Sequence, residues 1–146
     1  MLIQLSVFMN KRLIGIDYGL SKVGLSISDP LKIISIPLTV IKYKNSEELL
    51  NKLKEIAIEN DVDSFVIGYP LNMNSKKNKM TELVDIFFEE LKNMKFKVFL
   101  QDERLSSESA KKIMHEQNIK TGENKEQIDL IASTIILQSF LDKGVV

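Results

Sequence analysis

Three strand-like segments lie close together near the start of this sequence, and the short turns between them limit how they can pair. Leu13–Asp17 is apolar and ends in an aspartate, Val23–Ser28 alternates apolar with small residues, and Ile33–Val40 is the third segment. Parallel neighbours need a crossover of about a dozen residues, so these three strands must be antiparallel. Pro37, inside the third segment, predicts an edge strand or a bulge.

Helix and strand patterns alternate in the next part of the chain. Ser46 is expected to cap a first amphipathic helix, and a second is expected from about Thr81 to Asn93. Short apolar strands are expected at Ser64–Gly68, between these helices, and at Phe96–Leu100, after them. Each helix therefore forms a crossover, and the strands that it joins are parallel.

Two further helices are expected towards the C-terminus. One covers about 106–117, and the other ends at Leu141 after Asn124 and Gln127, which resemble a capping box. The complete order predicts an α/β fold with one five-stranded mixed sheet, three antiparallel strands and then two parallel ones, and helices on both faces. The first, fourth and fifth strands run in the same direction in this arrangement.

Length and charge limit the architecture and the kind of partner. The 146 residues fit a single domain spanning 1–146, with the apolar residues 1–10 as a candidate N-terminal extension. Lys and Arg together number 20, as do Asp and Glu, so the net charge is zero. A broad basic face for nucleic acid normally brings an excess of Lys and Arg. The balance argues against such a face but not against a small local site.

Cysteine and histidine usage excludes several classes of chemistry. Without cysteine the chain has no disulfide, no thiolate metal ligand and no cysteine nucleophile. The single histidine, His115, lies within a predicted helix and leaves little material for a zinc site or a Ser-His-Asp triad. Any metal chemistry must therefore rely on carboxylates, whose oxygen atoms favour Mg²⁺ or Mn²⁺.

Membrane insertion and secretion are not expected. The longest uncharged run, Leu130–Leu141, has 12 residues, whereas a membrane-spanning helix needs roughly 18 to 20. The apolar residues 1–10 precede Lys11 and Arg12, which is the reverse of the order in a secretory signal. We therefore expect a cytoplasmic protein with no membrane partner.

The carboxyl ends of the parallel strands are the expected place for a ligand, because ligands gather there in open α/β sheets. Three segments should meet at this edge: Gly15–Gly19, Gly68–Pro70 and Asp102–Arg104. Two bring carboxylates, and two bring glycines that we expect to let a ligand approach the backbone. Structural explanations stay open here, since Asp17 could bond its own turn and the acidic pair could begin a helix.

Asp129 is the most informative carboxylate, because it lies on an apolar helix face. That face continues 3, 7 and 11 residues further on through Ala132, Ile136 and Phe140. An isolated carboxylate there costs several kcal/mol unless it is paired or bound to a metal. A salt bridge to Lys125, four residues earlier, is the structural alternative. Small side chains at Ala132 and Ser133 would let the helix pack near the sheet edge and bring Asp129 to Asp17.

Three carboxylate-bearing segments around one crevice suggest a site for one or two Mg²⁺ ions, which would activate water for in-line attack on a phosphodiester. Asp17, Asp129 and one of the Asp102–Glu103 pair should then approach to about 5 Å, within reach of a shared metal. Basic groups would contact the substrate phosphates, and the candidates are Lys76, Lys77, Lys79 and Arg104. A solvated loop is the alternative for the lysines.

Four motifs in sequence resemble those of the YqgF family, which are RuvC-like nucleases with an RNase H-like fold. The first motif is Ile14–Gly19 with Val23-Gly24 and Ser28-Asp29, and the others are Gly68–Met73, Asp102–Ser107 and Lys125–Ala132. The resemblance covers about residues 11–141. It implies a cytosolic nuclease that processes the 5′ end of precursor 16S rRNA, in contact with a ribosomal assembly intermediate. An older assignment for the family is Holliday junction resolution, which would make branched DNA the substrate.

The resemblance also implies roles for individual residues. Its functional acids fall on Asp17, the Asp102–Glu103 pair and Asp129, and we favour Glu103 over Asp102 as the metal ligand. Substrate contacts are expected from Arg104, Lys76, Lys77, Lys22 and Lys125. Lys22 stands where the family commonly has Arg, and Asn74-Ser75 replace the usual acid-glycine pair. A monomer or weak homodimer is expected.

Two other functions fit parts of the same pattern. The sequence Gly-Ile-Asp-Tyr-Gly before a hairpin also resembles the phosphate loop of sugar kinases and actin-like ATPases, but those proteins close two such domains over ATP and are much longer. A non-catalytic module that binds RNA or ribosome-assembly intermediates could use the same fold. That module would keep its function when Asp17 is changed to Asn, whereas a nuclease would lose most of its activity.

Overall fold

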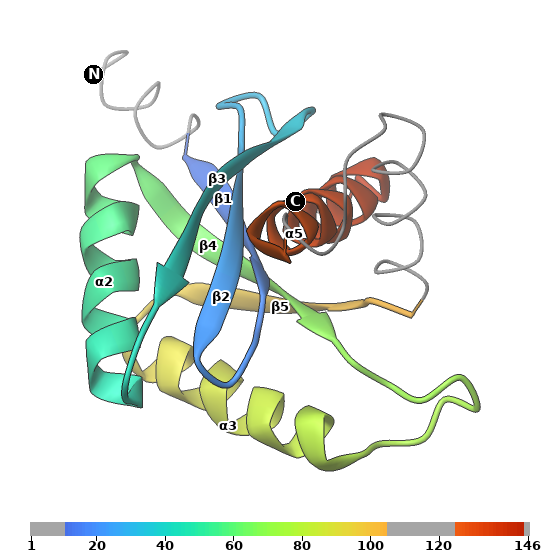
Figure 1. The fold of residues 1–146 in the computed structure, drawn as a ribbon. Helices are drawn as coiled ribbons and strands as arrows, with labels where there is room; N and C mark the ends of the chain where they lie inside the picture. The colour runs from blue at the N-terminus through green and yellow to red at the C-terminus, as the bar shows by residue number, and fades with distance from the viewer. Residues whose placement is uncertain (1–10, 105–124, 145–146) are drawn as a thin grey trace, which may run out of the picture.

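The computed structural model describes residues 11–104 and 125–144, which form five strands and three helices in these ranges (Figure 1). In chain order they are β1 (Arg12–Asp17), β2 (Lys22–Ser28), β3 (Ser35–Lys42), α2 (Ser46–Glu59), β4 (Val62–Tyr69), α3 (Lys79–Asn93), β5 (Lys97–Asp102) and α5 (Lys125–Asp142). The predicted short helix over 106–117, with His115, and the predicted cap at Asn124 lie outside the described residues. So do residues 1–10.

The five strands form one sheet in the order β3-β2-β1-β4-β5. β1 pairs antiparallel with β2, and β2 pairs antiparallel with β3. β1 and β5 both pair parallel with β4. The predicted mixed sheet, with its first, fourth and fifth strands in one direction, is confirmed. It follows that β1, β4 and β5 end at the same edge.

Pro37 lies where a proline costs a sheet least. β3 is an edge strand, so one side of its backbone needs no ladder partner. The β2–β3 register also shifts between Leu25 and Ser26, directly before the pair of Ser26 with Pro37. The prediction of an edge position or a bulge is confirmed, because Pro37 lies on an edge strand and next to an irregularity in the β2–β3 register.

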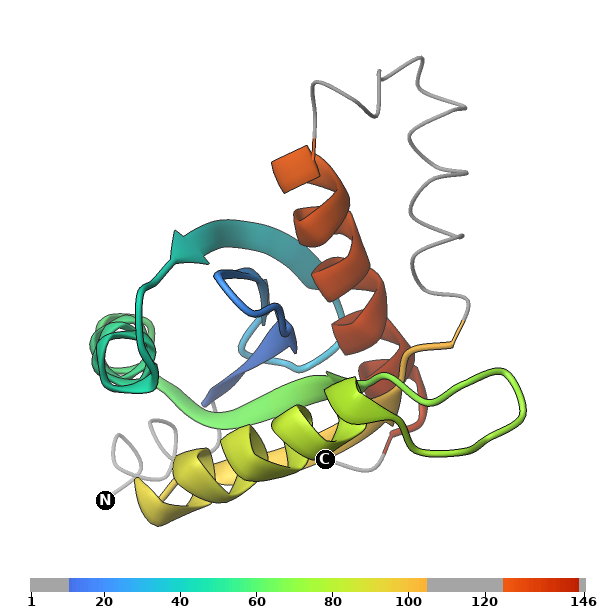
Figure 2. The ribbon, with the colours of Figure 1, turned by 60° about the horizontal axis from the view of Figure 1, so that its bottom comes forward.

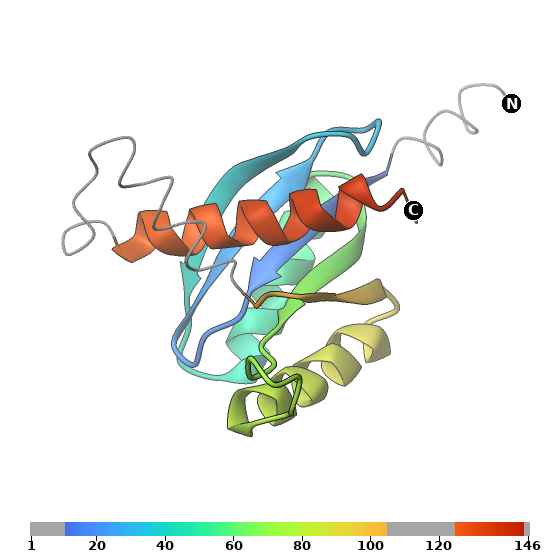
Figure 3. The same cartoon turned by 90° about the vertical axis from the view of Figure 1, so that its right-hand side faces the viewer.

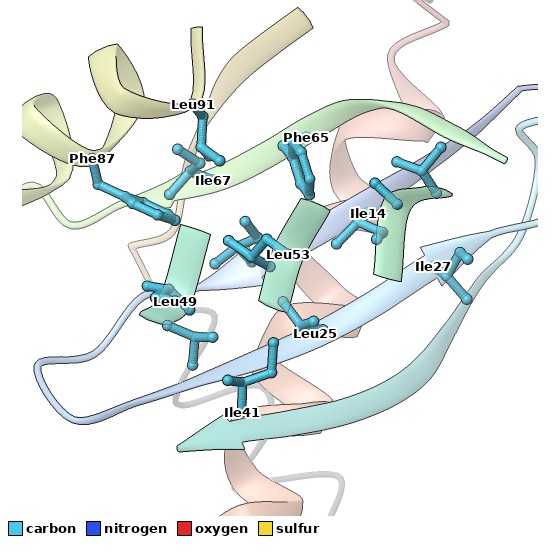
Figure 4. Close-up of a cluster of buried hydrophobic side chains, with 14 of the residues drawn as sticks. Ile14, Leu25, Ile27, Ile41, Leu49, Leu53, Phe65, Ile67, Phe87 and Leu91 are labelled. Carbon is cyan, nitrogen blue, oxygen red and sulfur yellow. The ribbon is translucent and has the colours of Figure 1, made fainter. Parts of the chain in front are cut away.

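One face of the sheet is covered by α2 and α3, which enclose the larger apolar core (Figures 1 and 4). Leu49 and Leu53 of α2 and Phe87 and Leu91 of α3 are almost fully buried. They meet alternate residues of the strands, among them Ile14, Ile16, Leu25, Phe65 and Ile67 (Figure 4). Side chains of a strand alternate between faces, so the intervening residues point to the opposite side.

The opposite face is covered by α5, which runs across the strands (Figure 3). Its buried side chains join two strand residues in a second core that contains Leu13, Val66, Ile136, Leu137, Phe140 and Leu141. The prediction of helices on both faces is confirmed. No helix among the described residues is long and apolar enough to cross a membrane.

Both described N-caps are asparagines. The prediction of Ser46 as a cap is wrong, because the Asn45 side chain accepts the Glu48 backbone N–H at 2.9 Å and Ser46 is the first helical residue. α3 likewise begins at Lys79 rather than Thr81, because Asn78 and Thr81 form a capping box. In both cases an asparagine slightly earlier in the chain caps the helix, and sequence alone does not rank the nearby capping candidates.

α5 packs unusually close to the sheet because two strand residues beneath it are glycines. A Cβ at Gly15 would lie 2.7 Å from Leu137 Cβ, and one at Gly24 would lie 2.7 Å from the Asp129 carbonyl carbon. Buried hydrogen bonds fix the contact: Ser133 Oγ donates to the Gly15 carbonyl at 2.8 Å, and Ser26 Oγ donates to the Ser133 carbonyl at 2.8 Å. The helix therefore packs across β1 and β2 and also contacts the edge strand β3, where the Ser35 backbone N–H donates to Gln138 Oε1 at 2.9 Å.

Substitution of Gly24 by Ala should displace the start of α5. The new methyl group would meet helix backbone, which cannot rotate away, so we expect the free energy of unfolding to fall by about 1–3 kcal/mol, as for other overpacked cores. Urea denaturation measures this change. Gly144→Ala is the control, because nothing lies within 4 Å of its Cβ and only its positive φ is strained. A Gly24→Ala variant as stable as the wild type would contradict the close packing of α5 on β2.

Candidate active site

Asp17 ends β1 on the face that α5 covers. Leu13 belongs to the core beneath α5, and Gly15 contacts that helix, so alternation along the strand directs Asp17 to the same side. Burial and, after it, the charges of Glu103 and Asp129 together raise the pKa of Asp17 to about 8, against the opposing effect of Lys22. The carboxyl of Asp17 is therefore buried close to two other acids.

Glu103 directly follows β5 and reaches the same face from the neighbouring strand ends. Its backbone N–H donates to the Tyr69 carbonyl at 3.2 Å, which continues the β4–β5 pairing beyond the last strand residue. Its carboxylate lies in the space that a side chain at Gly68 would fill, beside Ile136 of α5. Burial, and secondarily the charge of Asp102, raises the pKa of Glu103 to about 7.

Asp129 enters the site from α5. Its backbone rests on Gly24, and its Oδ2 atom lies 3.0 Å from Nζ of Lys22. That oxygen is buried and accepts no hydrogen bond in the part of the chain that the structure describes. The Lys22 ammonium is therefore close enough for an ion pair with Asp129 but is not oriented for a hydrogen bond to it. Lys22 thus occupies the partner position for which the sequence offered Lys125, whose side chain lies outside the described residues.

Asp102 and Arg104 form a separate unit. Arg104 donates from Nε to Asp102 Oδ2 at 2.8 Å and forms an ion pair from its Nη2 at 2.6 Å. Its Nη1 donates to Ser75 Oγ at 2.7 Å, which ties the end of β5 to the loop between β4 and α3. The hydrogen bond from Arg104 holds the pKa of Asp102 below its usual value. Asp102 is engaged by arginine, whereas Glu103 lies near Asp17.

The lysine-bearing loop projects from the end of β4 beyond the body of the protein (Figure 2). Lys76 and Lys77 are exposed, and Lys77 Nζ lies 3.5 Å from Asp85 Oδ2. The loop is closed at its base, where Asn78 Nδ2 donates to the Pro70 carbonyl at 2.8 Å. Lys79 begins α3 and is exposed as well.

Gly15 and Gly68 serve a different purpose from the one the sequence suggested. We expected them to let a ligand approach the backbone, but Gly15 is covered by α5 and Gly68 by Glu103 and Ile136. They allow protein groups to come close. Gly24, which sequence reasoning gave no role, belongs to the same set because it carries the backbone of Asp129.

A small cleft of about 170 Å³ opens beside two of the acids. It is lined by Asp17, Tyr18, Gly19, Leu20, Ser21, Lys22 and Asp129. A larger hollow of about 550 Å³ lies elsewhere, between β3, α2 and the start of α5. Of its charged groups, Lys42 pairs with Glu126 and Lys52 with Glu48. Two of the three clustered acids, Asp17 and Asp129, line the small cleft, so we place the candidate site there.

Tyr43 is a site-supporting residue that sequence reasoning missed. Its hydroxyl donates to the carbonyl of Gly19 and so holds the turn between β1 and β2. The ring of Tyr18 in the same turn packs on Phe87, with ring centroids 4.8 Å apart. No local pattern around Tyr43 signals this contact, because its partner is 24 residues away.

The acids cluster without forming a ready-made metal cage. The described residues contain no group of three Asp, Glu, His or Cys side chains placed to hold a metal ion. The predicted approach of three carboxylates to within metal reach is therefore not present. The raised pKa of Asp17 nevertheless shows that Glu103 and Asp129 are near enough to act on it electrostatically.

Comparison with known proteins identifies close relatives of this sequence. Residues 11–143 match the model of the family described as "RuvX: Holliday junction resolvase". A relative from Mycoplasmopsis synoviae is 41% identical over 133 residues, covering 90% of this chain and 97% of the relative. One from Ruminiclostridium cellulolyticum is 39% identical over 134 residues, covering 90% and 94%. Both carry the name "Putative pre-16S rRNA nuclease".

Solved structures share the fold at low identity. Thermus thermophilus RuvC, in complex with a Holliday junction substrate, aligns with a TM-score of 0.54 and 11% identity over 92% of this chain and 96% of that one. The fowlpox virus resolvase, in complex with Holliday junction DNA, gives 0.57 and 9% over 92% and 99%. The predicted RNase H-like fold is confirmed.

The raised pKa values predict that the metal-free protein loses stability as pH rises. Asp17 has an ordinary pKa of 3.8 and a folded value of about 8, and Glu103 changes from 4.5 to about 7. Folding then favours the protonated acids, whose contribution is complete below about pH 4 and is lost between about pH 4 and 8. Each titrating group contributes at most about 1.4 kcal/mol per pH unit.

Urea denaturation in a chelator at pH 5, 6, 7 and 8 measures this slope. Asp17→Asn should flatten it and should raise the free energy of unfolding at pH 8, because an amide does not ionise. Asp102→Asn is the matched control: arginine lowers the pKa of that acid, and its removal should flatten the profile much less than Asp17→Asn does, only through its secondary effect on the pKa of Glu103. A wild-type profile that rises towards pH 8 would contradict the clustering of buried acids.

Proposed function

This chain belongs to the RuvX family of Holliday junction resolvases and is a nuclease, a hydrolase of phosphodiester bonds in nucleic acid; from that premise we propose that it cuts precursor 16S rRNA at its 5′ end with a divalent metal ion. The family resemblance stated from the YqgF motifs is thereby confirmed. One observation carries the proposal: Asp17, Glu103 and Asp129 come from β1, the end of β5 and α5 to one face of the sheet.

The donor chemistry of these acids fits Mg²⁺ or Mn²⁺. All three offer only carboxylate oxygens, the ligands that these hard cations prefer. Asp129 Oδ2 is buried without a hydrogen-bond partner among the described residues, and the neighbouring acids make ionisation of Asp17 costly. A cation would relieve both conditions. When bound, it would supply an activated water and neutralise charge that develops on the phosphodiester.

We assign the remaining candidates by their surroundings. Lys76 and Lys77 are exposed on the projecting loop, where contacts to substrate phosphates are accessible. Lys22 lines the cleft and would act closer to the acids, and Lys125, the first residue of α5, is proposed from the family resemblance alone. The guanidinium of Arg104 is bound to Asp102 and Ser75, so its proposed part is to hold the loop in place for substrate.

Resolution of branched DNA is the second candidate function. The family description names it, and two proteins of the same fold were solved with Holliday junctions. We favour RNA because both relatives are named for precursor 16S rRNA. The RNA proposal implies a cytoplasmic monomer or weak homodimer that acts on a ribosomal assembly intermediate. A resolvase would need a symmetric dimer that cuts two strands.

Asp17→Asn should abolish nuclease activity while the protein stays folded. We expect a loss of at least about 100-fold, because removal of a central charged group from an electrostatic catalytic site costs that much or more. The assay offers wild type and variant a 5′-extended 16S precursor RNA and a four-way DNA junction in parallel, each with Mg²⁺ or Mn²⁺. Circular dichroism confirms folding.

The two substrates separate the functions. RNA cleavage that disappears in Asp17→Asn supports the proposal, and junction cleavage alone would establish the resolvase instead. If folded wild-type protein bound the RNA without cutting it and Asp17→Asn bound equally well, the non-catalytic binding module would be the better description.

Adjacent acids at the end of β5 should differ sharply in their effect on cleavage. Glu103→Gln should reduce kcat by about 100-fold or more, because Glu103 shares the buried face with Asp17. Asp102→Asn is the matched control and should keep kcat within a few-fold, with an increase in KM as Arg104 and the loop loosen. Equal loss of kcat in both variants would contradict this division.

A further inference from the structure

Two lysines lie side by side where β2 and β3 meet the start of α5. Lys22 and Lys42 are register partners in the antiparallel pair. Each forms an ion pair with α5: Lys22 with Asp129 at 3.0 Å, and Lys42 with Glu126 at 3.1 Å. The arrangement offers two similar tethers on one helix, one inside the candidate site and one outside it.

The two ion pairs differ in their exposure to water. The Lys22 and Asp129 side chains are 33% and 25% exposed, whereas those of Lys42 and Glu126 are 75% and 56% exposed. Water screens the outer pair and leaves it worth little. If the ion pair of Lys22 with Asp129 served only to hold α5 on the sheet, it would not need a second acid beside it. Lys22 nevertheless lines the cleft together with Asp17 and Asp129.

The charge count of the site gives Lys22 a further role. Asp17 is acted on by two carboxylates, those of Glu103 and Asp129, and by one ammonium, that of Lys22, which favours the ionised form of Asp17. Nζ of Lys22 also lies at Oδ2 of Asp129, the buried oxygen that lacks a hydrogen-bond partner in the described chain. The same oxygen is a ligand atom of the proposed metal site.

We propose that Lys22 is the resident counter-cation of the site: it holds Asp129 in place before metal binds and competes with a divalent cation for Asp129 Oδ2. This inference rests on the proposed metal-dependent nuclease. Binding of the metal displaces the ammonium, which then lies at the cleft, free to contact a substrate phosphate. Lys22 is therefore a positioning residue for Asp129 in the empty protein and a competitor of the cofactor.

Metal affinity of the full-length protein tests this role without any activity measurement. Calorimetric titration with Mn²⁺ compares wild type, Lys22→Met and the matched control Lys42→Met. Lys22→Met should bind Mn²⁺ at least about fivefold more tightly, because one unit charge about 4 Å from a divalent ion changes affinity by roughly 30-fold even at the dielectric constant of water, and displacement of the ammonium reduces that effect. Lys42→Met should change affinity by less than about twofold, because its pair is screened.

Thermal unfolding gives a second measure on the same proteins. Without metal, Lys22→Met should unfold at a lower temperature than Lys42→Met, since its three acids lack their cation. Addition of Mn²⁺ should raise its unfolding temperature by more than it raises that of the wild type. Lys22→Gln, which keeps a polar group at the cleft, replaces Lys22→Met if the latter does not fold.

The outcomes separate this inference from the proposed function. Suppose that the wild type binds Mn²⁺, that Asp17→Asn does not, and that Lys22→Met binds it no more tightly than the wild type. This result overturns the counter-cation role of Lys22 and leaves the nuclease proposal intact. Equal tightening in both lysine variants overturns it too, because the effect is then a general one of net charge. No Mn²⁺ binding by folded wild type overturns the proposed metal site and this inference together.

Discussion

The distance between α5 and the sheet governs everything at the candidate site. Asp129 is brought to Asp17 because the helix backbone descends onto Gly15 and Gly24, where a larger residue would hold it away. Hydrogen bonds through Ser133 then keep the helix at that depth. They also satisfy polar groups that burial would otherwise leave unpaired, which would cost about 1–3 kcal/mol each. A packing constraint therefore sets the electrostatics.

The close packing of α5 on the sheet has an unfavourable electrostatic consequence. Bringing Asp17, Glu103 and Asp129 to one buried face raises the pKa of Asp17 and opposes its ionisation. A stable core on both faces of the sheet must outweigh this repulsion, because the acids themselves do not stabilise the fold in the absence of a cation. Clustering of this kind is expected where function, and not stability, determines the side chains.

Local patterns were sufficient for most of the fold. Short connections determined the directions of β1, β2 and β3, and the apolar stripe of α5 placed Asp129 on its buried side. The choice between Asp102 and Glu103 was not available from alternation alone. It requires knowledge of which face α5 covers, and Phe99 in the core beneath α5 supplies that knowledge only once the layers are assembled. The ion pair of Lys22 is likewise a tertiary contact between residues 107 positions apart.

Substrate choice depends on a different part of the molecule from the acids. Hydrolysis at the proposed site would act on a phosphodiester, which RNA and DNA share, so the carboxylates alone would not distinguish the two substrates. The net charge of zero places recognition on local groups rather than on a broad basic face. Lys76 and Lys77 on the projecting loop are the groups that we propose for this contact, and the loop is fixed to the end of β5 through Arg104 and Ser75. Because Glu103 directly precedes that arginine, the proposed substrate surface would be mechanically connected to the proposed catalytic acids.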